Sequence, residues 1–361
     1  MADYVKVDGV AAADIVKIDG VAVASIVKVD GCTKATAAGA TQWALSAADA
    51  GVAYAANSDL TNWVSYETKA SESDDYRTVA YGKNGSGDPI WVVGWSQNPQ
   101  EIMWTDDITD TSIGSWTNVN LAGGIHDVCW GNDVWIAVGN NTSSRKGCYR
   151  STDGSTWSEV DMSSATGINT ATMYAVGNSG SKWLIAQQDR LYSSSDGQTW
   201  ALAHDFNDSN TTIWDLKYTN NTWVLLIGRT GSGSGPKIRT AAASDVTDWS
   251  AEQDLNIGAS TRRFGAANGV CIFAYSNDHQ VVDVDGKTAT LRTYTANQIQ
   301  AGARDIAGSG DGTWVIVGDS GHIVTSTDDG DNWTHSVNGL QIDGSVHNLD
   351  SVAANVYTPL L

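Results

Sequence analysis

The sequence predicts an all-β protein, a seven-bladed β-propeller of four-stranded antiparallel blades that is closed by strands from both ends of the chain. The composition supports this fold class, because 361 residues include 37 Gly and 16 Trp but only four Pro. Short runs of Val, Ile, Trp and Tyr are separated by Asn, Asp, Ser and Thr, a pattern typical of strands and turns. An apolar motif also recurs seven times along the chain. We therefore expect almost no helix.

The N-terminal segment is a repeat of 11 residues. Its copies span residues 5–15, 16–26 and 27–37, and each begins with Val-Lys-Val/Ile-Asp-Gly. Asp-Gly between apolar residues predicts a tight hairpin, but strands this short cannot bury a core. We expect residues 1–40 to be an attachment or oligomerisation arm that orders against a partner, and residues 41–361 to be the propeller. A disordered leader is the alternative.

The seven-fold repeat is marked by an aromatic or thiol side chain that begins a run of apolar residues. Successive markers lie 48, 44, 48, 40, 48 and 43 residues apart, the length of one propeller blade. We expect each marker to begin the second strand of a blade. The markers are Trp43, Trp91, Trp135, Trp183, Trp223, Cys271 and Trp314.

The other strands of each blade follow from the same repeat. A second marker about 20 residues further on closes a polar turn, and a further strand precedes six of the first markers. The first unit has no leading strand of its own, whereas residues 346–355 resemble a leading strand and precede no further unit. We therefore expect the C-terminal strand to complete the first blade. The second markers are Trp63, Trp116, Trp157, Trp200, Trp249, Leu291 and Trp333.

Three of the polar turns share a Ser-x-Asp…Gly…Trp pattern. The Ser and Asp side chains can hydrogen-bond the turn backbone, Gly supplies a positive φ, and Trp packs between blades, so we interpret the motif as structural. Decayed versions precede Trp63 and Trp249. The residues are Ser151, Asp153, Gly154 and Trp157; Ser194, Asp196, Gly197 and Trp200; and Ser326, Asp328, Gly330 and Trp333.

This motif resembles the Asp-box (BNR repeat) of sialidase-like propellers, and the resemblance covers roughly residues 41–355. The class includes sialidases, glycanases, sortilin-type receptors and photosystem assembly factors, and its boxes lie on the face away from the usual ligand site. A sialidase needs three arginines and a Tyr-Glu pair, a set that is not evident here. We therefore expect no enzymatic activity and no catalytic residue. A glycoside hydrolase with paired carboxylates is the alternative.

The arm resembles leader repeats in structural proteins of marine, especially cyanobacterial, tailed phages. This resemblance implies a virion component, such as a tail-fibre, tail-tip or capsid-surface protein, that assembles in the host cytoplasm. Its arm would attach to other virion proteins, and its propeller would bind a host-surface glycan or protein. Fibre proteins of this kind are often trimers, which implies a homo-oligomer. The alternative is a cellular propeller that acts as an assembly factor or a glycan-active enzyme.

Cations in the long polar loops are the candidate ligand-binding residues. In an acidic protein they are suited to contact an anionic sugar or a partner carboxylate, although isolated surface charges are commonly only solvated. Trp95 and Trp104 could stack on a sugar ring, but core packing is the preferred interpretation. The candidates are Arg77, Arg145, Lys146, Arg229 and Lys237.

The net charge and the remaining side chains argue against several classes of function. A net charge of −20 disfavours nucleic-acid binding and anionic membranes. No transmembrane stretch or signal peptide is evident, so we expect neither membrane insertion nor general secretory export. The four Cys and six His show no metal-ligand spacing, so we expect buried free thiols, no metal and no cofactor. Calcium at the acidic segment 106–110 stays open.

Overall fold

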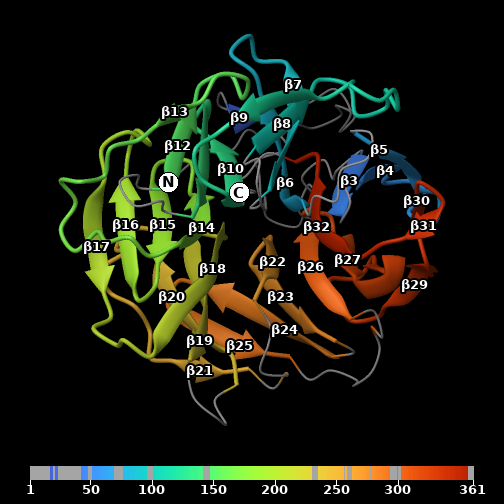
Figure 1. Ribbon diagram of the computed structural model, residues 1–361. Coiled ribbons are helices and arrows are strands. Elements are labelled where there is room, and N and C mark those ends of the chain that lie inside the picture. Colours follow the sequence, from blue (N-terminus) through green and yellow to red (C-terminus); the bar gives the residue numbers. More distant parts are fainter. Residues whose placement is uncertain are drawn as a thin grey trace.

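The structure, a computed structural model, confirms the seven-bladed propeller (Figure 1). It describes residues 17–18, 21–22, 42–47, 51–68, 76–95, 101–140, 147–229, 235–255, 257, 262–276, 278–292, 299 and 302–356. Seven four-stranded antiparallel sheets form the blades, and the first strands of neighbouring blades contact one another all the way round. These first strands therefore surround a central channel.

Blade 1 joins the two ends of the propeller. Its first strand is the C-terminal β32, which pairs with β3 and places Trp43 opposite Ala354. The leading strand begins later than residue 346, because a separate hairpin, β30–β31, comes first. The strands are β32 (Leu349–Ala354), β3 (Gln42–Ala47), β4 (Gly51–Ala56) and β5 (Val64–Glu67), and the hairpin is β30 (Gln341–Ile342) and β31 (Ser345–Val346).

Blades 2 to 4 follow in chain order, and each is a simple meander from the channel outwards. Blade 2 contains β6 (Tyr76–Lys83), β7 (Pro89–Trp95), β8 (Glu101–Thr105) and β9 (Thr117–Asn120). Blade 3 contains β10 (Ile125–Gly131), β11 (Val134–Gly139), β12 (Cys148–Ser151) and β13 (Ser158–Glu159). Blade 4 contains β14 (Met173–Asn178), β15 (Trp183–Gln187), β16 (Arg190–Ser194) and β17 (Ala201–Asp205).

Blades 5 to 7 repeat this arrangement. Blade 5 contains β18 (Thr211–Thr219), β19 (Thr222–Arg229), β20 (Lys237–Ala242) and β21 (Gln253–Asp254). Blade 6 contains β22 (Phe264–Ala267), β23 (Val270–Tyr275), β24 (Asp278–Asp285) and β25 (Thr288–Leu291). Blade 7 contains β26 (Ala303–Gly308), β27 (Trp314–Gly318), β28 (Ile323–Ser326) and β29 (Thr334–Val337).

Little else is regular in the described part of the chain. One 3-10 turn, η3 (Asp319–Gly321), is the helical element there, and no described helix has the length and apolarity needed to cross a bilayer. In the arm, β1 (Lys17–Ile18) pairs with β2 (Val21–Ala22) across two residues, which agrees with the hairpin predicted for the second repeat copy. The other two copies lie outside the described residues.

The hydrophobic core is divided among the blade interfaces. Seven buried clusters each combine side chains from two neighbouring blades. The second-strand markers form their centres: the six Trp side chains are at most 3% exposed, and Cys271 is fully buried. Because an aromatic side chain of this size buries a large apolar area, the repeat of Trp in the sequence fixes where neighbouring blades pack.

Candidate functional site

One position at the channel recurs in every blade, and we call its seven residues the channel ring. In six blades a β-bulge comes directly before this residue on the first strand, and such bulges re-aim side chains. In blade 6 the equivalent residue directly precedes β22. The ring residues are Thr78, Asp127, Ala175, Asp215, Arg263, Asp305 and Ser351.

The three acidic members of the channel ring and Ser351 bind the next blade. The first strand is an edge strand, whose backbone N–H groups need acceptors when they are buried. Each of these side chains accepts a hydrogen bond from an N–H of the following blade's first strand. The pairs are Val176 N to Asp127 Oδ2 (3.0 Å), Phe264 N to Asp215 Oδ2 (3.1 Å), Val352 N to Asp305 Oδ2 (3.1 Å) and Val79 N to Ser351 Oγ (3.2 Å).

Arg263 crosses the channel. Its Nη2 donates to the carbonyl oxygens of Arg77, at 3.0 Å, and His126, at 2.8 Å. These acceptors belong to blades 2 and 3, on the opposite side of the ring from blade 6. One guanidinium therefore ties blade 6 to blades 2 and 3 across the channel.

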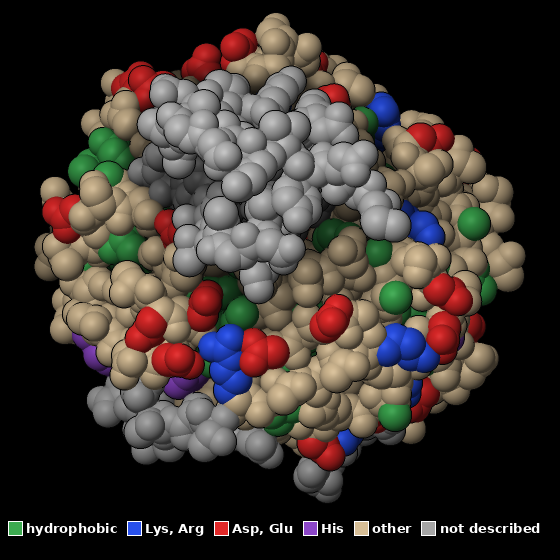
Figure 2. All heavy atoms as spheres, turned by 180° about the vertical axis from the view of Figure 1, so that it is seen from behind, with side chains coloured by type: hydrophobic (Ala, Val, Ile, Leu, Met, Phe, Trp, Pro, Cys, Tyr) green, Lys and Arg blue, Asp and Glu red, His purple; other side chains and the backbone are tan. Residues whose placement is uncertain are grey.

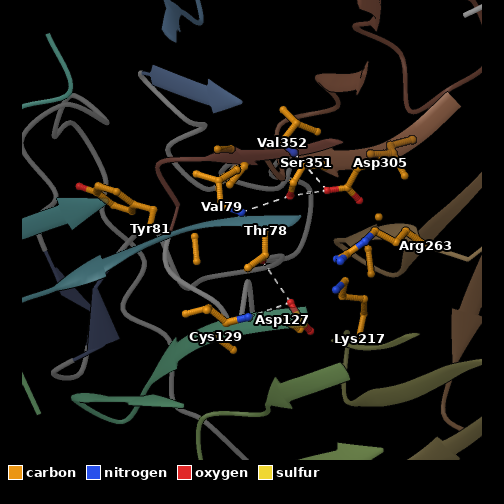
Figure 3. Close-up of a pocket in the computed structure, with 18 of the residues that line it drawn as sticks. Thr78, Val79, Tyr81, Asp127, Cys129, Lys217, Arg263, Asp305, Ser351 and Val352 are labelled. Carbon is orange, nitrogen blue, oxygen red and sulfur yellow. Dashed lines mark hydrogen bonds between the residues drawn. The ribbon is translucent and has the colours of Figure 1, made fainter. Parts of the chain in front are cut away.

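A second cation points into the same channel (Figure 3). Lys217 follows Asp215 by two residues on β18, so both side chains leave the same face of the strand. Its Nζ lies 2.9 Å from Asp215 Oδ1, and its side chain is 32% exposed while that of Asp215 is 2% exposed. The ammonium group is thus paired on one side and open to the channel on the other.

The ring carboxylates hold both cations in their charged form. Burial alone would lower the pKa of Lys217, but Asp215 and Asp127 outweigh it and raise that pKa above its ordinary value. Burial likewise opposes the charge of Arg263, while Asp305, Asp127 and Asp215 raise its pKa. Among the acids, burial raises the pKa of Asp215, against the opposing effect of the neighbouring Lys217. The cluster therefore places two cations among three acidic side chains.

Two of the three ring carboxyl groups are fully occupied by backbone N–H groups. Each oxygen of Asp127 and Asp215 already accepts a hydrogen bond from a backbone N–H. A hydrolase that uses two carboxylates needs one to donate a proton and the other to attack or activate water. Carboxylates that cap strand edges are poorly placed for either step. Lys217 and Arg263, by contrast, have N–H groups that no acceptor among the described residues uses.

The two sequence-predicted cations whose side chains the structure describes lie on different blades. Arg77 lies at the channel, on the first strand of blade 2, whereas Lys237 is on the third strand of blade 5 and pairs with Asp254. Arg229 ends β19, and its side chain lies outside the described part. Arg145 and Lys146 also lie outside the described residues. On the face in Figure 2, cationic side chains lie beside acidic ones instead of forming a patch.

The aromatic candidates are packed into the protein. Trp95 is fully buried, and Trp104 is half-buried against the cluster between blades 2 and 3. Their burial agrees with core packing, the preferred interpretation of both residues.

The three Ser-x-Asp turns share their main hydrogen bonds, although Asp328 accepts one backbone N–H where the aspartates of the other two turns accept two. In the second, Ser194 Oγ donates to Asp196 Oδ1 at 2.9 Å, and Asp196 Oδ1 accepts the N–H groups of Gln198 and Thr199 at 2.8 Å each. Trp200 Nε1 donates to the Gly197 carbonyl at 3.2 Å. Equivalent bonds are made by Ser151, Asp153, Gly154 and Trp157, and by Ser326, Asp328, Gly330 and Trp333. Each carboxylate is engaged within its own turn.

Metal-ligand chemistry finds little support in the described residues. They contain no group of three or more His, Cys, Asp or Glu placed to hold a metal ion. In the acidic segment 106–110, Asp107 and Asp110 accept hydrogen bonds from the backbone N–H groups two residues further on, in local turns. Cys129, Cys148 and Cys271 are free thiols, and burial raises the pKa of Cys129 to about 12. Cys32 lies outside the described residues.

Sequence reasoning missed the channel ring. Its signal was present, because Asp127, Asp215 and Asp305 occupy the same position in three leading strands: Ile-His-Asp-Val, Ile-Trp-Asp-Leu and Ala-Arg-Asp-Ile. A repeated charge in an otherwise apolar inner strand indicates a buried polar function. The cations Lys217 and Arg263 have no such repeat, so alignment of the blades alone would not have revealed them.

The fold and the channel define a seven-bladed β-propeller with a charged central site. No family model and no curated protein matches the sequence. Among solved structures, the chain is similar to YCF48 from Cyanidioschyzon merolae, with a TM-score of 0.56 and 13% identity over 79% of this chain and 96% of that one. It is also similar to YCF48 bound to D1 peptide, with a TM-score of 0.52 and 14% identity over 74% and 84%. Identities this low show a shared fold alone.

Proposed function

We propose that this protein is a non-enzymatic binding protein of a phage particle. The propeller presents a rigid ligand-binding disc, and the N-terminal arm attaches it to other virion proteins, with a homotrimer as the expected assembly. The observation that carries the non-enzymatic part is the channel ring. There the carboxylates of Asp127 and Asp215 accept hydrogen bonds from backbone N–H groups of the following blades, 4 and 6. The 11-residue repeat supports attachment, because its short hairpins need a partner to bury their apolar residues.

The Ser-x-Asp turns support the same proposal. As Asp-box turns they mark the architecture of the propeller and leave the opposite face, with its channel mouth and loops, for a host-surface glycan or protein. Arg77, Arg145, Lys146, Arg229 and Lys237 remain the proposed ligand contacts. An anionic sugar or an acidic protein segment is the matching ligand class.

Cryo-electron microscopy of purified phage particles that contain this chain tests the virion assignment. We expect density for a seven-bladed disc at the tail tip, at a fibre end or on the shell, and a peptide-mass match to the chain among the particle proteins. Particles that lack both the disc and the peptides contradict it.

A cellular assembly factor is the second candidate, since one similar structure is YCF48 bound to D1 peptide. A propeller with this function would bind a segment of a client protein. Affinity purification from the producing cells, with the arm-deleted propeller as the control bait, distinguishes the two. Capture that needs the arm and brings down capsid or tail proteins supports the virion, whereas arm-independent capture of one cellular client supports the assembly factor.

A further inference from the structure

The central channel contains a cavity of about 160 Å³ beside the charged members of the channel ring (Figure 3). Lys217, Arg263, Asp127 and Asp305 line it, and the rest of the wall is largely apolar, from alanines and valines to the aromatic Tyr81 and Trp130. Pockets for drug-sized molecules measure about 300–1,000 Å³, so this cavity suits a much smaller polar ligand.

The cations in the cavity have spare hydrogen-bond donors. An ammonium group has three N–H donors, and Lys217 directs one of them to Asp215. A guanidinium has five, and Arg263 uses the two on Nη2 for the carbonyls of Arg77 and His126. In the described part of the chain no acceptor is bonded to Nε or Nη1 of Arg263. These donors can receive a carboxylate.

One carboxylate oxygen in the cavity is also open. Asp305 is 8% exposed, and its Oδ2 accepts the N–H of Val352 and the hydroxyl of Ser351, at 3.1 and 2.7 Å. Its Oδ1 accepts no hydrogen bond from the described residues. An acceptor that faces the cavity without a donor from the described residues can take a hydrogen bond from a donor group on a ligand there.

Charge decides which ligand can use both features. Two acids, Asp127 and Asp305, line the cavity beside the two cations, so a plain anion would meet acidic side chains in a largely buried site. A plain cation would meet Lys217 and Arg263. A neutral ligand that carries both signs adds no net charge and satisfies both groups. We infer that the channel cavity binds a small zwitterion of the α-amino acid class, with its carboxylate on Lys217 and Arg263 and its ammonium on Asp305.

Isothermal titration of the full chain with three matched probes tests this inference. Glycine contains both groups, acetate only the carboxylate and methylammonium only the cation. We expect glycine to bind at least about tenfold more tightly than either partial probe, about 1.4 kcal/mol. Equal or tighter binding of acetate, or no detectable binding of glycine at millimolar concentrations, overturns the inference.

Two variants test the contacts. Asp305→Asn keeps an oxygen for Val352 and Ser351 but removes the charge, so glycine should bind about tenfold more weakly and acetate no more weakly than to the native chain. Lys217→Gln keeps an N–H donor for Asp215 but removes the positive charge. It should abolish binding of both probes. Unchanged glycine affinity in either variant contradicts the assignment.

A matched control is Lys287→Met, which removes a lysine from an exposed ion pair with Asp248 on the outside of the disc. We expect its glycine affinity to equal that of the native chain. Circular dichroism shows whether each variant keeps its β content, and the comparison of the three probes on the native chain needs no variant. Binding at this cavity is separate from attachment of the arm, so particles without the protein would leave this result unaffected.

Discussion

Nη2 of Arg263 lies 2.8 Å from the carbonyl oxygen of His126, although the two residues belong to blades on opposite sides of the propeller. In most of the fold a blade touches only its two neighbours, because the seven hydrophobic clusters each lie at one blade interface. Arg263 adds a tie across the centre. It also brings positive charge to three inward carboxylates, so its loss would affect several blades together.

Replacing Arg263 tests that tie. Arg263→Met removes two charge-assisted hydrogen bonds and leaves the ring carboxylates less compensated, so the free energy of unfolding should fall by about 2–4 kcal/mol. Lys287→Met, in an exposed pair, should cost less than about 1 kcal/mol. Urea denaturation of both variants gives the comparison. Equal losses would mean that the cross-channel bonds contribute nothing specific.

The Ser-x-Asp turns should make the protein sensitive to acid. Hydrogen bonds from the N–H groups of Thr199 and Gln198 lower the pKa of Asp196 from the ordinary 3.8 to about 2. A carboxyl whose pKa is lower in the folded state stabilises the fold above about pH 4, and this contribution is lost as the pH falls towards 2. Asp196→Asn, which keeps an acceptor oxygen, should therefore flatten the loss of stability in that window. Urea midpoints at pH 5, 4, 3 and about 2 check the slope, and parallel curves for the two proteins would contradict it.

The glycine of the same turn packs against the preceding blade. Gly197 has φ +69°, and an added Cβ would lie 2.7 Å from Ile136 Cδ1 on β11. Gly286 has a similar φ, +58°, with nothing within 4 Å of an added Cβ. Gly286→Ala should thus cost about 1 kcal/mol for backbone strain, and Gly197→Ala about 2–3 kcal/mol.

A double-mutant cycle separates the two contributions at Gly197. Ile136→Val removes the methyl group that the new Cβ would meet, so its effect should be smaller in the Gly197→Ala background than in the native chain. Thermal or urea unfolding of the four proteins gives the coupling energy. Strict additivity would place the cost in the backbone alone.

The two ends of the chain should respond differently to truncation. Removing residues 1–40 should leave the β content and the unfolding transition unchanged, because no blade strand is expected there. Removing residues 349–361 deletes β32, exposes the edge of β3 and should abolish the cooperative transition. Circular dichroism and urea unfolding of both proteins provide the check; loss of folding on removal of the arm would reject the division at residue 40.

The repeat in the sequence was sufficient to predict the fold, while the channel site was not predictable in the same way. Trp135 and its equivalents reveal the blades because burial of a large side chain is needed at each interface, and each interface therefore leaves the same mark in the sequence. Arg263 and Lys217 are not repeated at the equivalent positions of the other blades. Their role depends on which blades face each other across the channel, and the sequence does not show this. The candidate cations are rare positive charges in an acidic sequence, but the sequence does not show that Lys237 forms an ion pair with Asp254 on the neighbouring strand.

Closure of blade 1 has a consequence for how the protein folds. Gln42 and Asn355 are 313 residues apart and exchange hydrogen bonds where β3 meets β32. During synthesis, six meanders can form locally while the ring is still open, and the apolar face of β3 waits for its partner until nearly the whole propeller has left the ribosome. Contacts between such distant segments are slow to form and leave an unpaired edge exposed in the meantime. Premature release of the chain would therefore yield arcs that can join to one another through the same edge.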